Sequence, residues 1–341
     1  MLCLVLALQS GCVAWQPLPF VKKSPPELPE HYKHYYDYPK TEYPAQIVGQ
    51  WKKKGYTLRR LEFPLSLLEG SVVKDFEAYK KYVEDLAKTD EKTANDLKLL
   101  YTNRVDYYIP DDLKAGERRP AIVISSILGG TMVVDHFAKF YARRGFVAVI
   151  VHRKRPWWDD EKEMAQIEDH MRRAVIGLRQ VVDWLGGQKE VDINRIGAFG
   201  ISYGAVLHSV LAAVEPRIRY HILAMPGGRL ADVIIDCPDK AITKLIKQVH
   251  ELRGWSKDEM HERLRREIVT DPIYLAPYVD KTKVQIYIAL FDRVVGSSRS
   301  FDLWKAMEKP KLKIIPFGHY GGIVLLPYLQ LSSYLAFKRR L

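Results

Sequence analysis

The stretch Arg195-Ile-Gly-Ala-Phe-Gly-Ile-Ser-Tyr-Gly-Ala-Val-Leu207 decides the fold. An apolar strand pattern reaches Gly-x-Ser-x-Gly at Gly200, Ser202 and Gly204 and continues as an apolar helix pattern. A turn this tight strains the serine backbone, and side chains at both glycine positions would collide with the neighbouring strand and helix. We therefore expect Ser202 to point out above a sheet at the N-terminus of a helix, where the helix dipole favours developing negative charge.

Short apolar, β-rich segments alternate with helical patterns on both sides of this stretch, which predicts a mostly parallel sheet with helices on both faces. The eight expected strands are 56–63, 104–109, 121–125, 146–152, 195–199, 220–225, 284–290 and 311–316. Apolar residues at helical spacing also predict a surface helix within 72–99. A lid-like insertion of two helices is expected at 232–271, the second starting at a capping box of Ser256 and Glu259.

An aspartate and a histidine stand in the loops that follow the last two expected strands. Asp292 follows the strand at 284–290, and His319 follows the strand at 311–316. The carboxyl ends of parallel strands lie at one edge of a sheet, so loops that follow such strands are expected at the same edge. The intervals are 90 residues (292 − 202) and 27 residues (319 − 292).

These residues make the sequence similar to the α/β-hydrolase superfamily over residues 55–341. The resemblance implies a catalytic triad in the chain order serine, acid, histidine. It implies Ser202 as nucleophile, His319 as general base and then acid, and Asp292 as the carboxylate that orients the imidazole. A serine hydroxyl is a weak nucleophile unless an imidazole takes its proton. No metal or other cofactor is expected, because this mechanism needs none.

The tetrahedral oxyanion needs two backbone N–H donors, one from the residue after the serine and one from the loop after the strand at 121–125. Tyr203 supplies the first in this interpretation, and Leu128 is our prediction for the second. The loop reads Ser-Ile-Leu-Gly-Gly-Thr at 126–131, where much of the superfamily has His-Gly-x-Gly. Ile127 and Gly129 therefore stay open as alternatives.

Rival assignments exist for the base and for the acid. His136, His152 and His208 are alternative bases, and Asp232 is an alternative acid because some superfamily members place the acid after the preceding strand. The run 153–158, Arg-Lys-Arg-Pro-Trp-Trp, follows the fourth expected strand and is either a wall of the substrate pocket or a cover of the core edge.

Within the superfamily, the chain most resembles the branch of dienelactone hydrolases, acetyl xylan esterases and prolyl-oligopeptidase-like enzymes. This resemblance implies acyl transfer to water from a small-molecule ester or acyl substrate. A peptidase or an acyltransferase of the same fold stays open. A binding protein of the cell envelope that keeps the fold without catalysis is the alternative from a different class.

Composition restricts the partners. The chain has 341 residues, 47% hydrophobic and 28% charged, with a net charge of +12. Such a composition is typical of a globular protein and excludes a disordered chain or a coiled coil. The basic residues are spread along the chain without a zinc-finger or helix-turn-helix motif, so we expect no nucleic-acid partner. The sequence does not indicate an oligomeric state.

The first residues resemble a bacterial lipoprotein signal. Residues 1–8 are mostly apolar, and small residues precede Cys12, which the resemblance implies as a lipidation site. Gln9 stands where such signals usually have an aliphatic residue. We expect a signal segment at 1–14 and a tether rich in proline and tyrosine at 15–54. An exported protein of the cell envelope, anchored by lipid, follows from this interpretation, with a cytoplasmic protein as the alternative.

Overall fold

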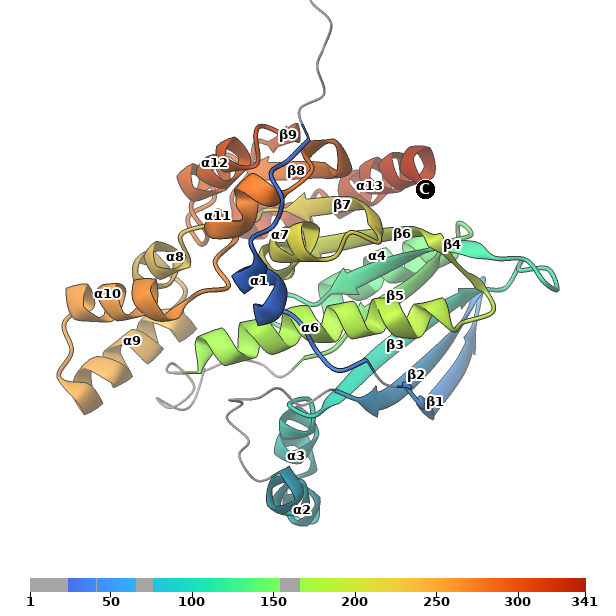
Figure 1. The fold of residues 1–341 in the computed structure, drawn as a ribbon, viewed down its shortest axis with the longest axis horizontal. Helices are drawn as coiled ribbons and strands as arrows, with labels where there is room; N and C mark the ends of the chain where they lie inside the picture. The colour runs from blue at the N-terminus through green and yellow to red at the C-terminus, as the bar shows by residue number, and fades with distance from the viewer. Residues whose placement is uncertain (1–23, 41, 66–75, 154–165) are drawn as a thin grey trace, which may run out of the picture.

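The computed structural model describes residues 24–40, 42–65, 76–153 and 166–341, which surround and include one large sheet (Figure 1). Nine strands lie in the order β1-β2-β3-β5-β4-β6-β7-β8-β9. β1, β2 and β3 pair antiparallel with their neighbours, whereas the strands from β5 to β9 along the sheet pair in parallel. Their bounds are β1 Gln46–Lys53, β2 Tyr56–Pro64, β3 Thr102–Pro110, β4 Arg119–Ser125, β5 Val147–Val151, β6 Val191–Ile201, β7 Ile218–Ala224, β8 Val284–Ala289 and β9 Lys311–Ile315.

The eight expected strands are all present, and the mostly parallel sheet is confirmed. The helices are α1 Glu30–Tyr35, α2 Phe76–Leu86, α3 Glu91–Lys98, α4 Met132–Ala142, α6 Ile167–Gly186, α7 Tyr203–Val214, α8 Leu230–Asp236, α9 Lys240–Arg253, α10 Lys257–Glu267, α11 Pro272–Leu275, α12 Ser297–Ala306 and α13 Leu326–Arg340. Short 3₁₀ turns lie at Ala276–Tyr278, Lys281–Lys283 and His319–Ile323.

Both faces of the sheet are covered, because its central strands are apolar on both sides. On β8, Ile286 and Ile288 pack in a cluster with Leu303 of α12, while Tyr287 packs in the cluster formed with α4 and α13. This alternation follows from the two-residue period of a strand. Helices α6 and α7 cover the same face as α12, and α4 and α13 lie behind the sheet in Figure 1.

The structure differs from the expected tether over residues 24–40 and 42–53, which we name the N-terminal strap. These residues form α1 and the edge strand β1, which pairs with β2. Tyr36 and Tyr38 of the strap are buried in the core. The Tyr36 hydroxyl donates to Thr270 Oγ1 at 3.0 Å, and the Tyr38 hydroxyl donates to Asp183 Oδ2 at 2.6 Å. The tether prediction is therefore wrong for the described part of 15–54. A few large aromatic anchors hold this segment, and they leave no periodic pattern in the sequence.

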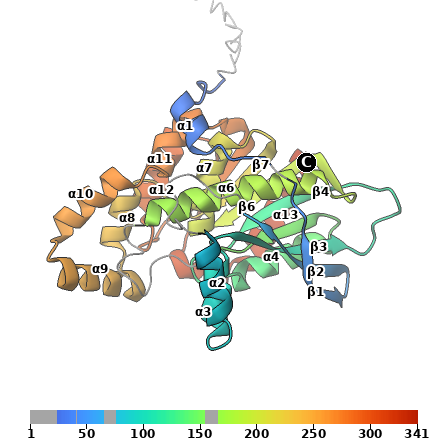
Figure 2. The same ribbon diagram turned by 60° about the horizontal axis from the view of Figure 1, so that its bottom comes forward.

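Two helical segments also differ in detail. The expected surface helix within 72–99 is divided into α2 and α3, since Asp90 accepts a hydrogen bond from the backbone N–H of Thr93 and starts a new helix. The insertion at 232–271 contains α8, α9 and α10 rather than two helices. The expected capping box of Ser256 and Glu259 is present at the start of α10. The insertion helices project beyond one end of the sheet, and α2 and α3 project as a separate pair (Figure 1, Figure 2).

Within the described ranges, every helix is too short or too polar to cross a membrane. The expected signal segment at 1–14 and Cys12 lie outside the described residues.

Candidate active site

The turn between β6 and α7 holds Ser202 in a strained conformation. Its φ is 55° and its ψ is −122°, and Ser202 is the residue before the first turn of α7. A Cβ on Gly200 would lie 2.4 Å from the Gly204 carbonyl oxygen, and a Cβ on Gly204 would lie 2.7 Å from the Ser125 carbonyl oxygen. The collisions expected from the sequence at both glycines are confirmed. The strain and the crowding together aim the Ser202 side chain out of the sheet.

The loops that follow β8 and β9 are fixed to each other through backbone contacts. The N–H of Leu290 donates to the Ile315 carbonyl at 2.9 Å, and the N–H of Phe291 donates to the Phe317 carbonyl at 3.1 Å. Gly318 lies against the Phe291 carbonyl, which a Cβ would approach to 3.1 Å. These contacts place Asp292 and His319, which are distant in sequence, on adjoining loops at one edge of the sheet.

The structure brings Ser202, His319 and Asp292 together in one hydrogen-bonded chain. His319 Nε2 lies 2.9 Å from Ser202 Oγ, and His319 Nδ1 lies 2.8 Å from Asp292 Oδ2. The other carboxylate oxygen of Asp292 accepts the N–H groups of Val294 at 2.9 Å and Val295 at 3.0 Å. Burial raises the pKa of the Asp292 carboxyl, but its bonds to His319 and to these N–H groups outweigh burial and hold the pKa below its usual value. Asp292 therefore stays ionised beside the imidazole.

The rival residues make no hydrogen bond to Ser202 or His319, although His152 lines the same cavity. Asp232 pairs with His261, whose Nε2 lies 2.5 Å from Asp232 Oδ1. His152 Nε2 lies 2.9 Å from Asp106 Oδ2. His136 is exposed on α4, and His208 is fully buried within α7. None of these side chains is in the hydrogen-bonded chain that contains Ser202.

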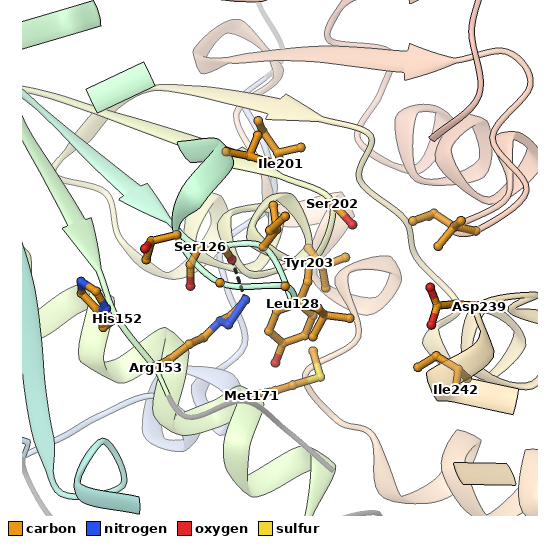
Figure 3. Close-up of a pocket in the computed structure, with 18 of the residues that line it drawn as sticks. Ser126, Leu128, His152, Arg153, Met171, Ile201, Ser202, Tyr203, Asp239 and Ile242 are labelled. Carbon is orange, nitrogen blue, oxygen red and sulfur yellow. Dashed lines mark hydrogen bonds between the residues drawn. The ribbon is translucent and has the colours of Figure 1, made fainter. Parts of the chain in front are cut away.

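A large cavity opens over the serine (Figure 3). It has a volume of about 1240 Å³, and Ser202 and His319 lie on its wall. Apolar side chains from α6 and from the insertion form much of its surface, among them Ile167, Met171, Leu230, Ile234 and Ile242. The cavity can therefore hold an apolar group next to the Ser202 hydroxyl.

The predicted oxyanion donors lie on the same wall. Tyr203 and Leu128 both line the cavity, as do the alternatives Ile127 and Gly129. The loop makes a tight turn in which the Gly130 N–H donates to the Ile127 carbonyl at 3.1 Å. The assignment of the second N–H donor to Leu128 stays a prediction.

Hydrogen bonds join the two ends of the insertion to each other and join the insertion to the loop of His319. Asp271, after α10, accepts the backbone N–H of Arg229 at 3.0 Å and of Leu230 at 2.6 Å, just where α8 begins. At the cavity, the Tyr320 hydroxyl donates to Asp239 Oδ2 at 2.8 Å and so joins the loop of His319 to the loop between α8 and α9. These bonds hold the insertion as one wall of the cavity.

Some lining residues had no signal in the sequence. Asp90, which caps α3, and Asp96 of α3 also line the cavity, although the pattern of 72–99 indicates only a surface helix. Of the run 153–158, Arg153 lines the cavity, while the remaining residues lie outside the described part of the chain. In the ranges that the structure describes, histidine, cysteine and carboxylate side chains form no cluster that could hold a metal ion.

Fold and site together define the class of protein. A mostly parallel sheet covered on both faces, with a strand, Gly-x-Ser-x-Gly and helix in the middle and an acid and a histidine after later strands, is the architecture of α/β-hydrolases. Solved structures of that fold match nearly the whole chain, as given below. The chain has the α/β-hydrolase fold.

Comparison with known proteins finds one matching family model and curated relatives that match part of the chain. Residues 80–237 match the family model of the X-Pro dipeptidyl-peptidase (S15 family). An uncharacterized protein of Mycobacterium tuberculosis (strain ATCC 25618 / H37Rv) is 28% identical over 159 residues, which cover 44% of this chain and 33% of the relative. The chain thus spans about a third of the length of the curated relatives that it matches.

Solved structures resemble the chain over a larger part of its length. Acetyl xylan esterase 1 from Thermoanaerobacterium sp. superposes with a TM-score of 0.62 at 17% identity, covering 90% of this chain and 95% of that chain. The acetyl xylan esterase from Paenibacillus sp. R4 superposes with a TM-score of 0.63 at 15% identity, and the match covers 96% of this chain and 100% of that chain. The acylaminoacyl peptidase of Pyrococcus horikoshii superposes with a TM-score of 0.50 at 14% identity, covering 88% of this chain and 49% of that chain.

Proposed function

We propose that the protein is a serine hydrolase that cleaves carboxylic esters of small molecules through an acyl-enzyme intermediate. The observation that carries the proposal is the hydrogen-bonded chain of Ser202, His319 and Asp292 on the wall of a large cavity. A buried carboxylate, an imidazole and a hydroxyl in this order supply the activation that a serine needs to attack an ester carbonyl.

Each residue has one role in the proposed reaction. His319 Nε2 takes the Ser202 proton as Oγ bonds to the ester carbonyl carbon, and the imidazolium then gives that proton to the departing alkoxide. Asp292 holds the Nδ1–H in place and stabilises the imidazolium. Water, activated by the same imidazole, then releases the acid from Ser202. The backbone N–H groups of Tyr203 and Leu128 bind the oxyanion in both halves of the reaction.

Two findings favour esters over peptides. The match to each acetyl xylan esterase covers 90% or more of this chain and of the esterase. The match to the acylaminoacyl peptidase covers only 49% of the peptidase. The apolar cavity wall next to Ser202 also suits the acyl or alcohol part of a small ester.

A peptidase is the second candidate, because residues 80–237 match the X-Pro dipeptidyl-peptidase family model. The test is to compare p-nitrophenyl acetate and butyrate with an Xaa-Pro p-nitroanilide under the same conditions. Our proposal predicts turnover of the esters and a kcat/KM for the anilide lower by about two orders of magnitude or more. A preference for the anilide would replace the ester proposal with the peptidase. Added alcohols that divert the acyl group from water would instead indicate an acyltransferase.

The assignment of the acid has a matched pair of variants. Asp292→Asn should lower kcat by about four orders of magnitude, as loss of the orienting carboxylate does in other triads. Asp232→Asn, whose side chain bonds to His261, should leave kcat nearly unchanged. The opposite pattern would assign the acid to Asp232.

We further propose export and lipid anchoring through Cys12. Support comes from the apolar run 1–8 and the small residues before Cys12. Metabolic labelling with a fatty acid should mark the parent protein and not Cys12→Ser. Equal labelling of both proteins, or none of the parent, would contradict the anchor.

A further inference from the structure

Arg153 links two parts of the candidate active site that the chain itself does not connect. It follows β5 and reaches between the loop after β4 and the first turn of α7 (Figure 3). One guanidinium nitrogen donates to the Ser126 carbonyl oxygen at 2.5 Å. The guanidinium carbon also lies 4.3 Å from the centre of the Tyr203 ring. Both contacts fall on segments that carry predicted oxyanion donors.

The peptide that Arg153 holds is under a second restraint. A Cβ on Gly204 would lie 3.2 Å from the Ser126 carbonyl oxygen, so this oxygen is in close contact with the backbone of α7 as well. The Ser126 carbonyl and the Ile127 N–H belong to one planar peptide unit, and fixing the first fixes the direction of the second. The next carbonyl, that of Ile127, accepts the Gly130 N–H at 3.1 Å. Two consecutive peptide planes before Leu128 are thus oriented, the first by Arg153.

The charge on Arg153 is retained in this environment. Burial lowers the pKa of the Arg153 guanidinium to about 10, which leaves it a cation at neutral pH. A hydrogen bond from a cation to a carbonyl is shorter and stronger than one between neutral groups. An aromatic face attracts the same cation electrostatically. Both contacts therefore depend on the guanidinium and not merely on the length of the side chain.

We propose that Arg153 is a positioning residue for the oxyanion hole, which sets the loop 126–128 against the start of α7 so that N–H donors from both segments face the oxyanion on Ser202. This inference rests on the proposed serine-hydrolase function. An oxyanion hole acts through the precise placement of its donors, because they must meet the charge that develops in the transition state. A residue that fixes this placement affects kcat more than it affects substrate binding.

Arg153→Met, which removes the cation but keeps the chain length, tests the proposal with p-nitrophenyl butyrate as substrate. We expect kcat to fall by about 10- to 100-fold while KM changes by less than about threefold. The affinity for phenylboronic acid, which forms a tetrahedral adduct on an activated serine, should fall by about the same factor as kcat. Arg153→Lys keeps a cation that can reach one partner and should recover part of the loss.

Arg172 provides a matched control. Its guanidinium carbon lies 4.3 Å from the Tyr35 ring centre, and its Nε donates to the Tyr35 carbonyl at 2.7 Å. Arg172 thus makes the same pair of contacts on the N-terminal strap, and it is not among the described residues that line the cavity. Arg172→Met should lower stability but leave kcat and the boronic acid affinity unchanged.

Several results would overturn the inference. A folded Arg153→Met with kcat within twofold of the parent would do so, and so would a rise in KM alone, which would make Arg153 a substrate-binding residue. If Arg153→Met does not fold, Arg153→Lys decides, and unchanged kcat and boronic acid affinity in that variant would contradict the proposal. Fluorophosphonate labelling of the parent distinguishes failure of the positioning role from failure of the proposed serine-hydrolase function. A labelled parent with an unaffected Arg153 variant refutes only the positioning role, whereas a parent that is neither labelled nor active refutes the proposed function as well.

Discussion

The turn at Ser202 and the N-terminal strap depend on different kinds of information in the sequence. The turn is marked by neighbouring residues in the sequence, since Gly200, Ser202 and Gly204 lie within five positions, although the close approach at Gly204 is to Ser125 of β4. The strap is held by contacts across the chain, such as the bond from Tyr36 to Thr270, 234 residues away. The first region holds the proposed nucleophile in a strained conformation, whereas the second holds α6 and the end of the insertion in place. Variants in the two regions should therefore affect different observables.

The largest effect is expected in the candidate active site. His319→Ala removes the proposed general base and should lower kcat on p-nitrophenyl butyrate by about three orders of magnitude or more. The free energy of unfolding should change by no more than about 1 kcal/mol, because Asp292 keeps its bonds to the N–H groups of Val294 and Val295. Steady-state kinetics and urea unfolding of the same preparation check both numbers. Loss of activity through unfolding would remove the contrast between the regions.

The strap should respond in the opposite way. Tyr36→Ala removes a fully buried ring and its bond to Thr270, which should lower the free energy of unfolding by about 4 kcal/mol. At a temperature where the variant is folded, its kcat should equal that of the parent. Tyr36→Phe removes only the hydroxyl and should cost about 1 kcal/mol. A Tyr36→Ala protein as stable as the parent would mean that the segment is a tether after all.

Two buried histidines of the core, His208 and His221, should give the free energy of unfolding a pH dependence of intermediate size. Burial lowers the pKa of His208 to about 3 and that of His221 well below its usual value. The unfolded chain, with histidine pKa near 6.5, therefore binds protons that the folded state does not bind. The contribution of these histidines to the free energy of unfolding is fully present above pH ~6.5, and it is lost as the pH falls from there towards about 3.

His208 should contribute a loss of about 2 kcal/mol between pH 7 and pH 5, and His221 should contribute a loss in the same direction. Urea unfolding of the parent and of His208→Leu at both pH values measures this contribution. The variant should lose about 2 kcal/mol less than the parent over that interval. An identical pH dependence would indicate that His208 does not stay neutral in the folded protein.

The smallest effect tests the strain at the turn. Ser202→Gly relieves the unfavourable φ of 55° and should raise the free energy of unfolding by about 1 kcal/mol, while it removes the proposed nucleophile. Ser202→Ala keeps the strain and is the matched control, which should leave stability nearly unchanged. A Ser202→Gly protein less stable than Ser202→Ala would show that the turn stores no strain.

The difference between local patterns and contacts across the chain also explains how much of the fold and of the candidate site could be predicted from the sequence. The eight strands follow from apolar runs, and the loops of Asp292 and His319 follow from their places after strands. The strap could not be predicted, since Tyr36 and Tyr38 find partners only in the folded chain. The contact of Arg153 with Ser126 and Tyr203 is also invisible in the sequence, because it joins three segments through packing alone. Local sterics can be read from neighbours, whereas tertiary anchors cannot.

The most direct test of the central claim is labelling of the purified protein with a fluorophosphonate probe, followed by mass spectrometry of the labelled peptide. A serine activated by His319 and Asp292 should react covalently, with the phosphonate on Ser202 and no labelling of folded Ser202→Ala. Labelling of the parent at another residue, or a folded parent that does not react while a control serine hydrolase does, would contradict the account.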